Sequence, residues 1–79
     1  MIPTSVIENI KTAINQSPRN FYVAELHLQV IKYADLFEEV TGKEFCEALG
    51  IGESFGTEFS KMRKIAPRLK GAHLDVSKL

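Results

Sequence analysis

The sequence predicts a small all-α domain of about four helices that spans residues 1–79. Apolar residues recur at intervals of three and four over much of the chain, which is the period of a helix with one buried face. The 79 residues suffice for one core and are too few for two. Hydrophobic residues make up 44% and charged residues 25% of the chain, a balance typical of folded domains and not of disordered segments.

The first helix is predicted to begin at Thr4 or Ser5, where a hydroxyl can cap the free backbone amides of the first turn. Its apolar face comprises Val6, Ile7, Ile10, Ala13 and Ile14. The pattern stops within residues 15–18. Ser17 and Pro18 then signal the start of another helix, because serine can cap and proline fits the first helical position.

One long helix is favoured over residues 21–40, because no turn signal interrupts this densely apolar segment. Its later part follows helical spacing through Leu26, Val30, Tyr33, Phe37 and Val40. Residues 21–30 also alternate as a strand would, so a strand there stays open and would change the fold class. As a helix, this segment would be the central core element or part of a dimer interface.

A short helix follows, with a predicted start and stop. Thr41 and Glu44 have the spacing of a capping box, in which each side chain satisfies a free backbone amide of the other residue. The helix is expected to end at Gly50, because glycine readily takes the left-handed conformation that closes a helix.

A fourth helix is predicted over residues 53–66, with one apolar stripe formed by Phe55, Phe59 and Met62. Pro67 is expected to end or kink it, because proline removes a helical hydrogen bond. In the tail, residues 68–79, apolar and polar residues alternate weakly. The tail could form a short strand, an arm or a segment exchanged between two copies.

The short capped helix, the glycine turn and the second helix, residues 41–66, together resemble the helix-turn-helix DNA-binding regulators of bacteria and phage. Aligning Gly50 with the turn glycine of that family puts four residues on its buried positions: Phe45, Leu49, Ile51 and Phe59. Cys46 falls on the family's small-residue position, where alanine is usual. Gly56 departs from the pattern, since the family usually has a buried branched residue there, and we expect Phe55 to fill that volume. The resemblance covers about a third of the chain.

The charges are separated along the chain although the formal net charge is zero. Residues 33–60 contain seven acidic residues and one basic residue, whereas residues 61–70 contain five basic residues and no acidic one. Zero net charge argues against unselective coating of nucleic acid. A domain with separated charges can nevertheless present a positive face to an anionic partner.

The resemblance implies that the helix over residues 53–66 reads the major groove of double-stranded DNA and that the protein regulates transcription. A homodimer is expected, because one small domain reads too few base pairs alone. Ser54 and Thr57 would then reach base edges or phosphates near the helix start. The remaining predicted DNA-binding residues would mainly meet phosphates: Lys61, Arg63, Lys64, Arg68 and Lys70.

No residue pattern supports catalysis, a metal or a cofactor. His27 and His73 lack further ligands at metal-binding spacing, and Cys46 lacks an adjacent base, so we expect it to be a small buried residue. No apolar run approaches the roughly 20 residues that span a bilayer, and no signal peptide is visible. A single thiol fits a reducing compartment, so a cytoplasmic protein is expected.

Two other functions stay open. A protein-interaction adaptor would use the apolar helix, residues 21–40, while the basic stretch contacts an acidic protein partner. A small phage or plasmid protein that inhibits a host enzyme is the weaker alternative. Salt dependence distinguishes DNA binding from an apolar interface, because only DNA binding releases condensed counterions.

Overall fold

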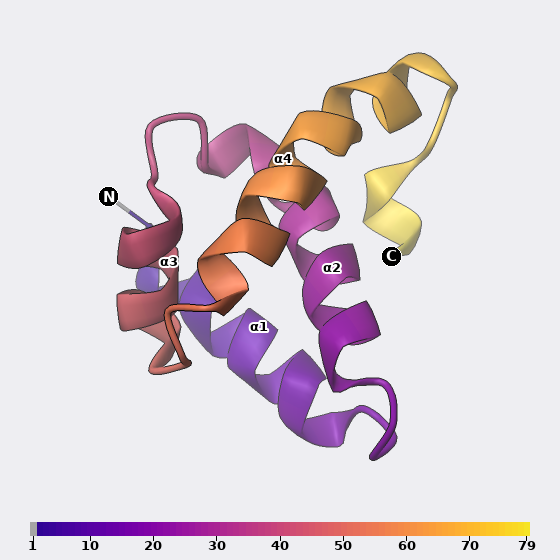
Figure 1. The fold of residues 1–79 in the computed structure, drawn as a ribbon. Coiled ribbons are helices and arrows are strands. Elements are labelled where there is room, and N and C mark those ends of the chain that lie inside the picture. Colours follow the sequence, from indigo (N-terminus) through magenta and orange to yellow (C-terminus); the bar gives the residue numbers. More distant parts are fainter. Residues whose placement is uncertain (1) are drawn as a thin grey trace.

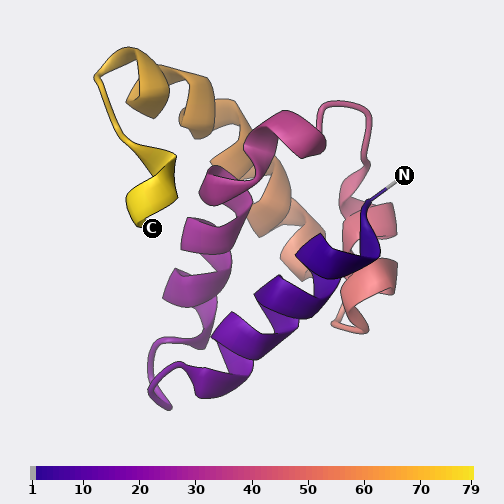
Figure 2. The same cartoon turned by 180° about the vertical axis from the view of Figure 1, so that it is seen from behind.

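The computed structural model describes residues 2–79, which form four α-helices and two short 3-10 turns. The helices are α1 (Thr4–Gln16), α2 (Tyr22–Lys32), α3 (Gly42–Leu49) and α4 (Phe55–Gly71). The 3-10 turn η1 (Ala34–Leu36) follows α2, and η2 (Val76–Lys78) follows α4. In Figure 1, α4 crosses the front of the molecule and α1 lies behind, as the reverse view in Figure 2 shows. The small all-α bundle is confirmed, and the strand alternative for residues 21–30 is wrong.

Hydroxyl side chains do not start the first two helices as predicted. The N-cap of α1 is Pro3, without a capping side chain, in place of Thr4 or Ser5. The Ser17 hydroxyl donates a hydrogen bond of 2.6 Å to a carbonyl in the last turn of α1. Ser17 therefore helps to end the first helix, and α2 begins only after a turn formed by residues 18–21.

The predicted long helix over residues 21–40 is wrong in its second half, because α2 ends at Lys32. The chain turns back through η1 and buries Phe37 completely. The Phe37 ring centroid lies 5.5 Å from the centroids of both Phe45 and Phe59. A continuous helix of about 20 residues would extend for about 30 Å and carry Phe37 away from these rings.

Arg63 of α4 stabilises this reversal of the chain. Its guanidinium donates to the carbonyl oxygen of Phe37 at 2.9 Å and also to that of Val40. The same group lies 4.9 Å from the centroid of the Phe59 ring. Both carbonyls lie outside a regular helix, and the Phe37 carbonyl also accepts from the Val40 N–H at 3.1 Å. The guanidinium adds a charged donor to each carbonyl where the chain reverses. Arg63 therefore ties α4 to the segment that joins α2 and α3.

Helices α3 and α4 cross at two glycines. A Cβ atom on Gly42 would lie 2.9 Å from the Cα atom and the carbonyl oxygen of Gly56, too close for a side chain. The backbone of α3 therefore fills the volume beside Gly56. The expectation that Phe55 fills this volume is wrong. The Phe55 ring packs instead against Tyr22, with 5.7 Å between the ring centroids.

The predicted ends of α3 are confirmed. The Glu44 N–H donates to the Thr41 hydroxyl and the Thr41 N–H donates to the Glu44 carboxylate, each at 3.1 Å. This donation by the Thr41 N–H lowers the pKa of Glu44. Gly50 has φ 69°, and the next N–H, that of Ile51, donates to the Cys46 carbonyl at 3.0 Å. The Gly50 N–H donates to the Glu47 carbonyl at 3.2 Å. These two bonds are the closing pattern of a glycine-terminated helix.

The helix predicted over residues 53–66 is displaced and longer, since α4 begins at Phe55 and passes through Pro67 without ending. Pro67 itself is exposed. Ala66 and Leu69, on either side of it, contribute to a second apolar cluster with residues of α2 and η1. This burial stabilises the helical turn that proline alone would weaken.

The tail after α4 folds back on α2 and forms η2 in place of a strand. Leu74 and Leu79 pack against the second apolar cluster, and the Lys32 ammonium donates to the Leu79 carbonyl at 3.2 Å. Figure 1 shows this segment returning toward α2 at the C-terminus. Residues 72–79 therefore cover one end of the contact between α2 and α4.

Substitution of the two crossing glycines should have opposite effects. Gly42→Ala forces α3 and α4 apart and should lower the free energy of unfolding by about 1–3 kcal/mol. Gly56→Ala places its methyl group 3.5 Å from the Gly42 backbone, an ordinary contact. It should raise stability by about 0.5–1 kcal/mol through helix propensity. Urea denaturation followed by circular dichroism measures both. Equal stability of Gly42→Ala and the wild type would contradict the tight crossing.

Removal of the Arg63 side chain should also destabilise the fold. Arg63→Ala removes a charged donor from the Val40 carbonyl and one of the two donors to the Phe37 carbonyl, and should cost about 1.5–3 kcal/mol. Arg68→Ala, on the exposed side of the same helix, is the matched control and should change stability by less than about 0.5 kcal/mol. Denaturant midpoints of the two variants measure the difference. Equal midpoints would argue against a structural role for Arg63.

Candidate nucleic-acid interface

The α3–turn–α4 segment is held to the core by the residues predicted to be buried. Phe45, Leu49 and Phe59 are buried, and Ile51 in the turn is partly buried. Cys46 is fully buried as predicted, and this burial raises the pKa of its thiol. The stacked rings of Phe45 and Phe59, with centroids 4.5 Å apart, join the two helices directly. One face of α4 is thus fixed against the core and the opposite face lies outward.

Four predicted DNA-binding residues line up on the outward face of α4. Thr57, Lys61, Lys64 and Arg68 are separated by four, three and four residues and are all exposed. Residues at these intervals lie on the same side of a helix. We call this row the basic stripe; it runs along α4, the helix at the front of Figure 1. Ser54, also exposed, is the N-cap residue just before the stripe.

Two other predicted residues are engaged with the protein itself. Arg63 donates to the carbonyls of the segment before α3, as described above. The Lys70 ammonium lies 2.7 Å from the Asp35 carboxylate, and the side chain of Asp35 is 83% exposed. Such an exposed ion pair contributes little to stability, yet it directs Lys70 toward η1. The structure therefore separates Arg63 and Lys70 from the basic stripe.

A histidine–carboxylate contact on the flank of α4 was not foreseen from the sequence. His27 Nε2 of α2 lies 3.1 Å from a carboxylate oxygen of Glu58, and both side chains are about a third exposed. The contact joins residues 31 positions apart, so no local pattern reveals it. The contact with His27 keeps the Glu58 carboxylate close to α2.

Acidic side chains are exposed on the elements that precede α4. Glu44 and Glu47 are exposed on α3, and Glu53 is exposed in the turn before α4. The middle and the C-terminal half of α4 carry the exposed basic groups instead. The charge separation read from the sequence is retained on the folded surface.

Residues 2–79 offer neither a metal site nor a membrane-spanning helix. No three or more His, Cys, Asp and Glu side chains in this range gather closely enough to hold a metal ion. None of the helices described is both long enough and apolar enough to cross a membrane.

Comparison with known proteins identifies one family. A scan of protein-family models matches residues 4–72 to the HTH-like domain, where HTH denotes helix-turn-helix. No curated protein and no solved structure matches the chain. The match includes all four α-helices and extends well beyond the segment on which the sequence resemblance rests. The chain belongs to the HTH-like domain family.

Proposed function

We propose that the protein binds double-stranded DNA through the basic stripe on α4, with residues 41–66 acting as the helix-turn-helix. The observation that carries this proposal is the stripe itself: Lys61, Lys64 and Arg68 are exposed in one row on the second helix of an HTH-like domain. A row of cations on a helix that can enter the major groove suits contact with phosphates on both sides of the groove.

The roles of individual residues follow from their positions along α4. Lys61, Lys64 and Arg68 bind phosphates and supply affinity without sequence preference. Thr57 precedes these cations on the stripe, and its hydroxyl and methyl groups can contact base edges. Ser54 reaches a base or a phosphate at the helix start. Arg63 and Lys70, engaged within the protein, contribute mainly to the position of α4.

The biological role that fits this surface best is transcriptional regulation by a homodimer in the cytoplasm. One copy offers only three exposed cations on the stripe, and two copies would read two half-sites. No cofactor and no catalytic step is needed for this role.

Exposed apolar residues favour protein binding as the second candidate function. Phe21 is 56% exposed, and Val23 and Leu28 of α2 are 40% and 42% exposed. Phe21 and Leu28 are seven residues apart and therefore lie on the same side of the helix, and a contiguous exposed apolar patch is typical of an interface with another protein. An adaptor would bind its partner mainly by apolar burial, with little dependence on salt.

Removal of cations from the stripe should weaken DNA binding. We expect wild-type protein to raise the fluorescence anisotropy of a labelled random-sequence duplex at low salt, and Lys61→Ala/Lys64→Ala to bind at least about tenfold more weakly. The control is Arg19→Ala/Lys78→Ala, which removes the same charge from exposed residues outside α4. Absence of binding by folded wild-type protein would refute the proposal, as would equal losses in both double variants.

Salt should weaken binding in proportion to the phosphates contacted. Three contacts predict a slope of about −2.7 in a plot of log affinity against log salt concentration. Arg68→Ala should reduce the magnitude of this slope by about one contact, or about 0.9. A slope near zero in the wild type would favour the protein-binding alternative, because apolar interfaces release no condensed counterions.

A further inference from the structure

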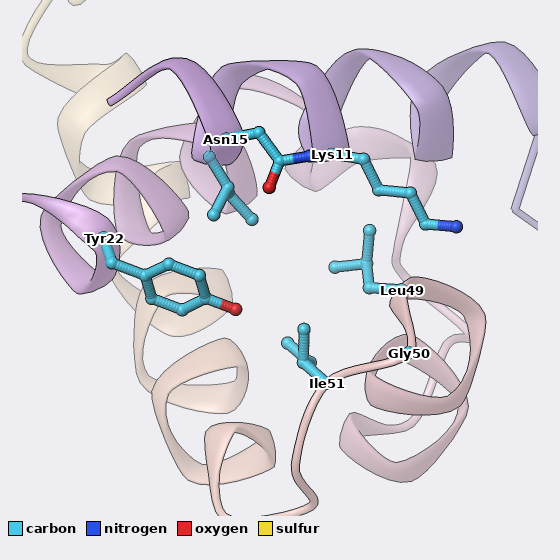
Figure 3. A pocket seen from close by; sticks show the side chains of 7 residues that line it. Lys11, Asn15, Tyr22, Leu49, Gly50 and Ile51 are labelled. Carbon is cyan, nitrogen blue, oxygen red and sulfur yellow. The ribbon is translucent and has the colours of Figure 1, made fainter. Parts of the chain in front are cut away.

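A cavity of about 230 Å³ opens between the end of α1, the start of α2 and the turn after α3. Its apolar wall is formed by Ile14, Leu49 and Ile51. In Figure 3 the Tyr22 hydroxyl and the Asn15 carboxamide face the hollow, while the Lys11 side chain extends past Leu49. The cavity therefore combines an apolar wall, two neutral polar groups and one cation.

We propose that this cavity binds a small monocarboxylic acid with a branched or aromatic apolar group. The apolar group would lie against Ile14, Leu49 and Ile51, and the carboxylate near the Lys11 ammonium. The Lys11 side chain is only partly buried, so a carboxylate there keeps part of its hydration and avoids the high cost of full burial. Neither ion pair found among residues 2–79 involves Lys11. Its charge is thus free to bind an anion.

The size of the cavity restricts the ligand to a small molecule. Sites for drug-sized ligands usually measure about 300–1,000 Å³, and this cavity is smaller. A ligand of about ten non-hydrogen atoms suits the space, and its affinity is limited by the few contacts that so small a molecule can make. The Tyr22 hydroxyl and the Asn15 amide can each bond to one polar substituent, which would favour acids that carry a hydroxyl or carbonyl group.

The ligand would touch two residues that position the start of α4. Ile51 belongs to the turn between α3 and α4, and the Tyr22 ring lies 5.7 Å from the ring of Phe55, the first residue of α4. A ligand that binds one arrangement of this turn better than another shifts the protein toward that arrangement. Such an acid would thereby alter the affinity of α4 for DNA. This coupling rests on the proposed function, whereas binding of the acid does not.

The first test uses the full chain without DNA. Benzoate and isovalerate are titrated into labelled protein and followed by proton–nitrogen correlation NMR. We expect saturable shifts of the Tyr22, Gly50 and Ile51 amides, with Kd of about 1 mM or lower. Benzamide, which lacks the charge, and acetate, which lacks the apolar group, should each bind about tenfold more weakly.

Variants of two lysines separate the cavity from general anion binding. Lys11→Met should weaken benzoate binding about tenfold, while Lys43→Met, an exposed lysine at the start of α3, should leave it unchanged. The proposed site is refuted if neither acid produces saturable shifts at the cavity by about 10 mM. Shifts confined to Lys61 and Lys64 of the basic stripe, or equal binding by Lys11→Met and wild type, would also refute it.

The coupling is tested by measuring DNA anisotropy with and without saturating benzoate. We expect at least about a threefold change in DNA affinity in the wild type and none in Lys11→Met. Unchanged affinity in a wild-type protein that binds both benzoate and DNA would refute the coupling alone. If the protein does not bind DNA at all, the proposed function fails and the NMR titration still decides whether the cavity binds the acid.

Discussion

The packing of Phe37, Phe45 and Phe59 is the contact on which the position of α4 depends. These rings come from the segment before α3, from α3 and from α4, and all three are fully buried. Their centroids lie 4.5–5.5 Å apart, within the range of favourable aromatic contacts. Phe37 can reach the other two rings only because the chain leaves the helix after Lys32. The Arg63 guanidinium donates to the Phe37 and Val40 carbonyls in the segment that follows. The end of α2, the aromatic cluster and the partly buried arginine are therefore one arrangement.

This arrangement also explains which cations of α4 remain available. Phe59 turns inward, so residues about half a turn away face outward, and these include Lys61, Lys64 and Arg68. Arg63 lies on the side of α4 that faces Phe37, and its guanidinium donates a hydrogen bond to the Phe37 carbonyl. The glycine crossing supports the same orientation, because a side chain at Gly42 would force α3 and α4 apart. The basic stripe is thus the face of α4 that stays exposed to solvent, because the other faces contact the core.

Local signals predicted the features that depend on local physics. The capping box at Thr41 and Glu44, the left-handed Gly50 and the apolar faces of the helices all follow from spacing over a few residues. The end of α2 was missed because Phe37 and Val40 keep helical spacing, and the reason to break the helix is a contact with rings later in the chain. Pro67 was misjudged for a similar reason, since burial of Ala66 and Leu69 outweighs its local effect.

At the candidate site, too, local spacing predicts some features, and contacts between distant residues decide the others. Periodicity alone places Thr57, Lys61, Lys64 and Arg68 on one face, whereas the contacts of Arg63, Lys70 and His27 involve partners 23 to 35 residues away along the chain. The charge of a helical segment therefore overstates the charge that it can offer to a ligand. Residues 61–70 hold five basic residues, but two of them are engaged within the fold.

This reduced count bears directly on the proposed DNA-binding function. Three phosphate contacts give a salt slope of about −2.7, whereas specific repressors that form six to ten contacts reach steeper slopes and higher affinity. The exposed Glu53, two residues before α4, would weaken binding further, because a carboxylate near the start of a groove-reading helix repels phosphates. One copy would therefore bind DNA weakly and with little selectivity. Two linked copies would double the contacts and make the second binding event intramolecular, so the selective regulation that we propose would require a homodimer or a partner that supplies further cations.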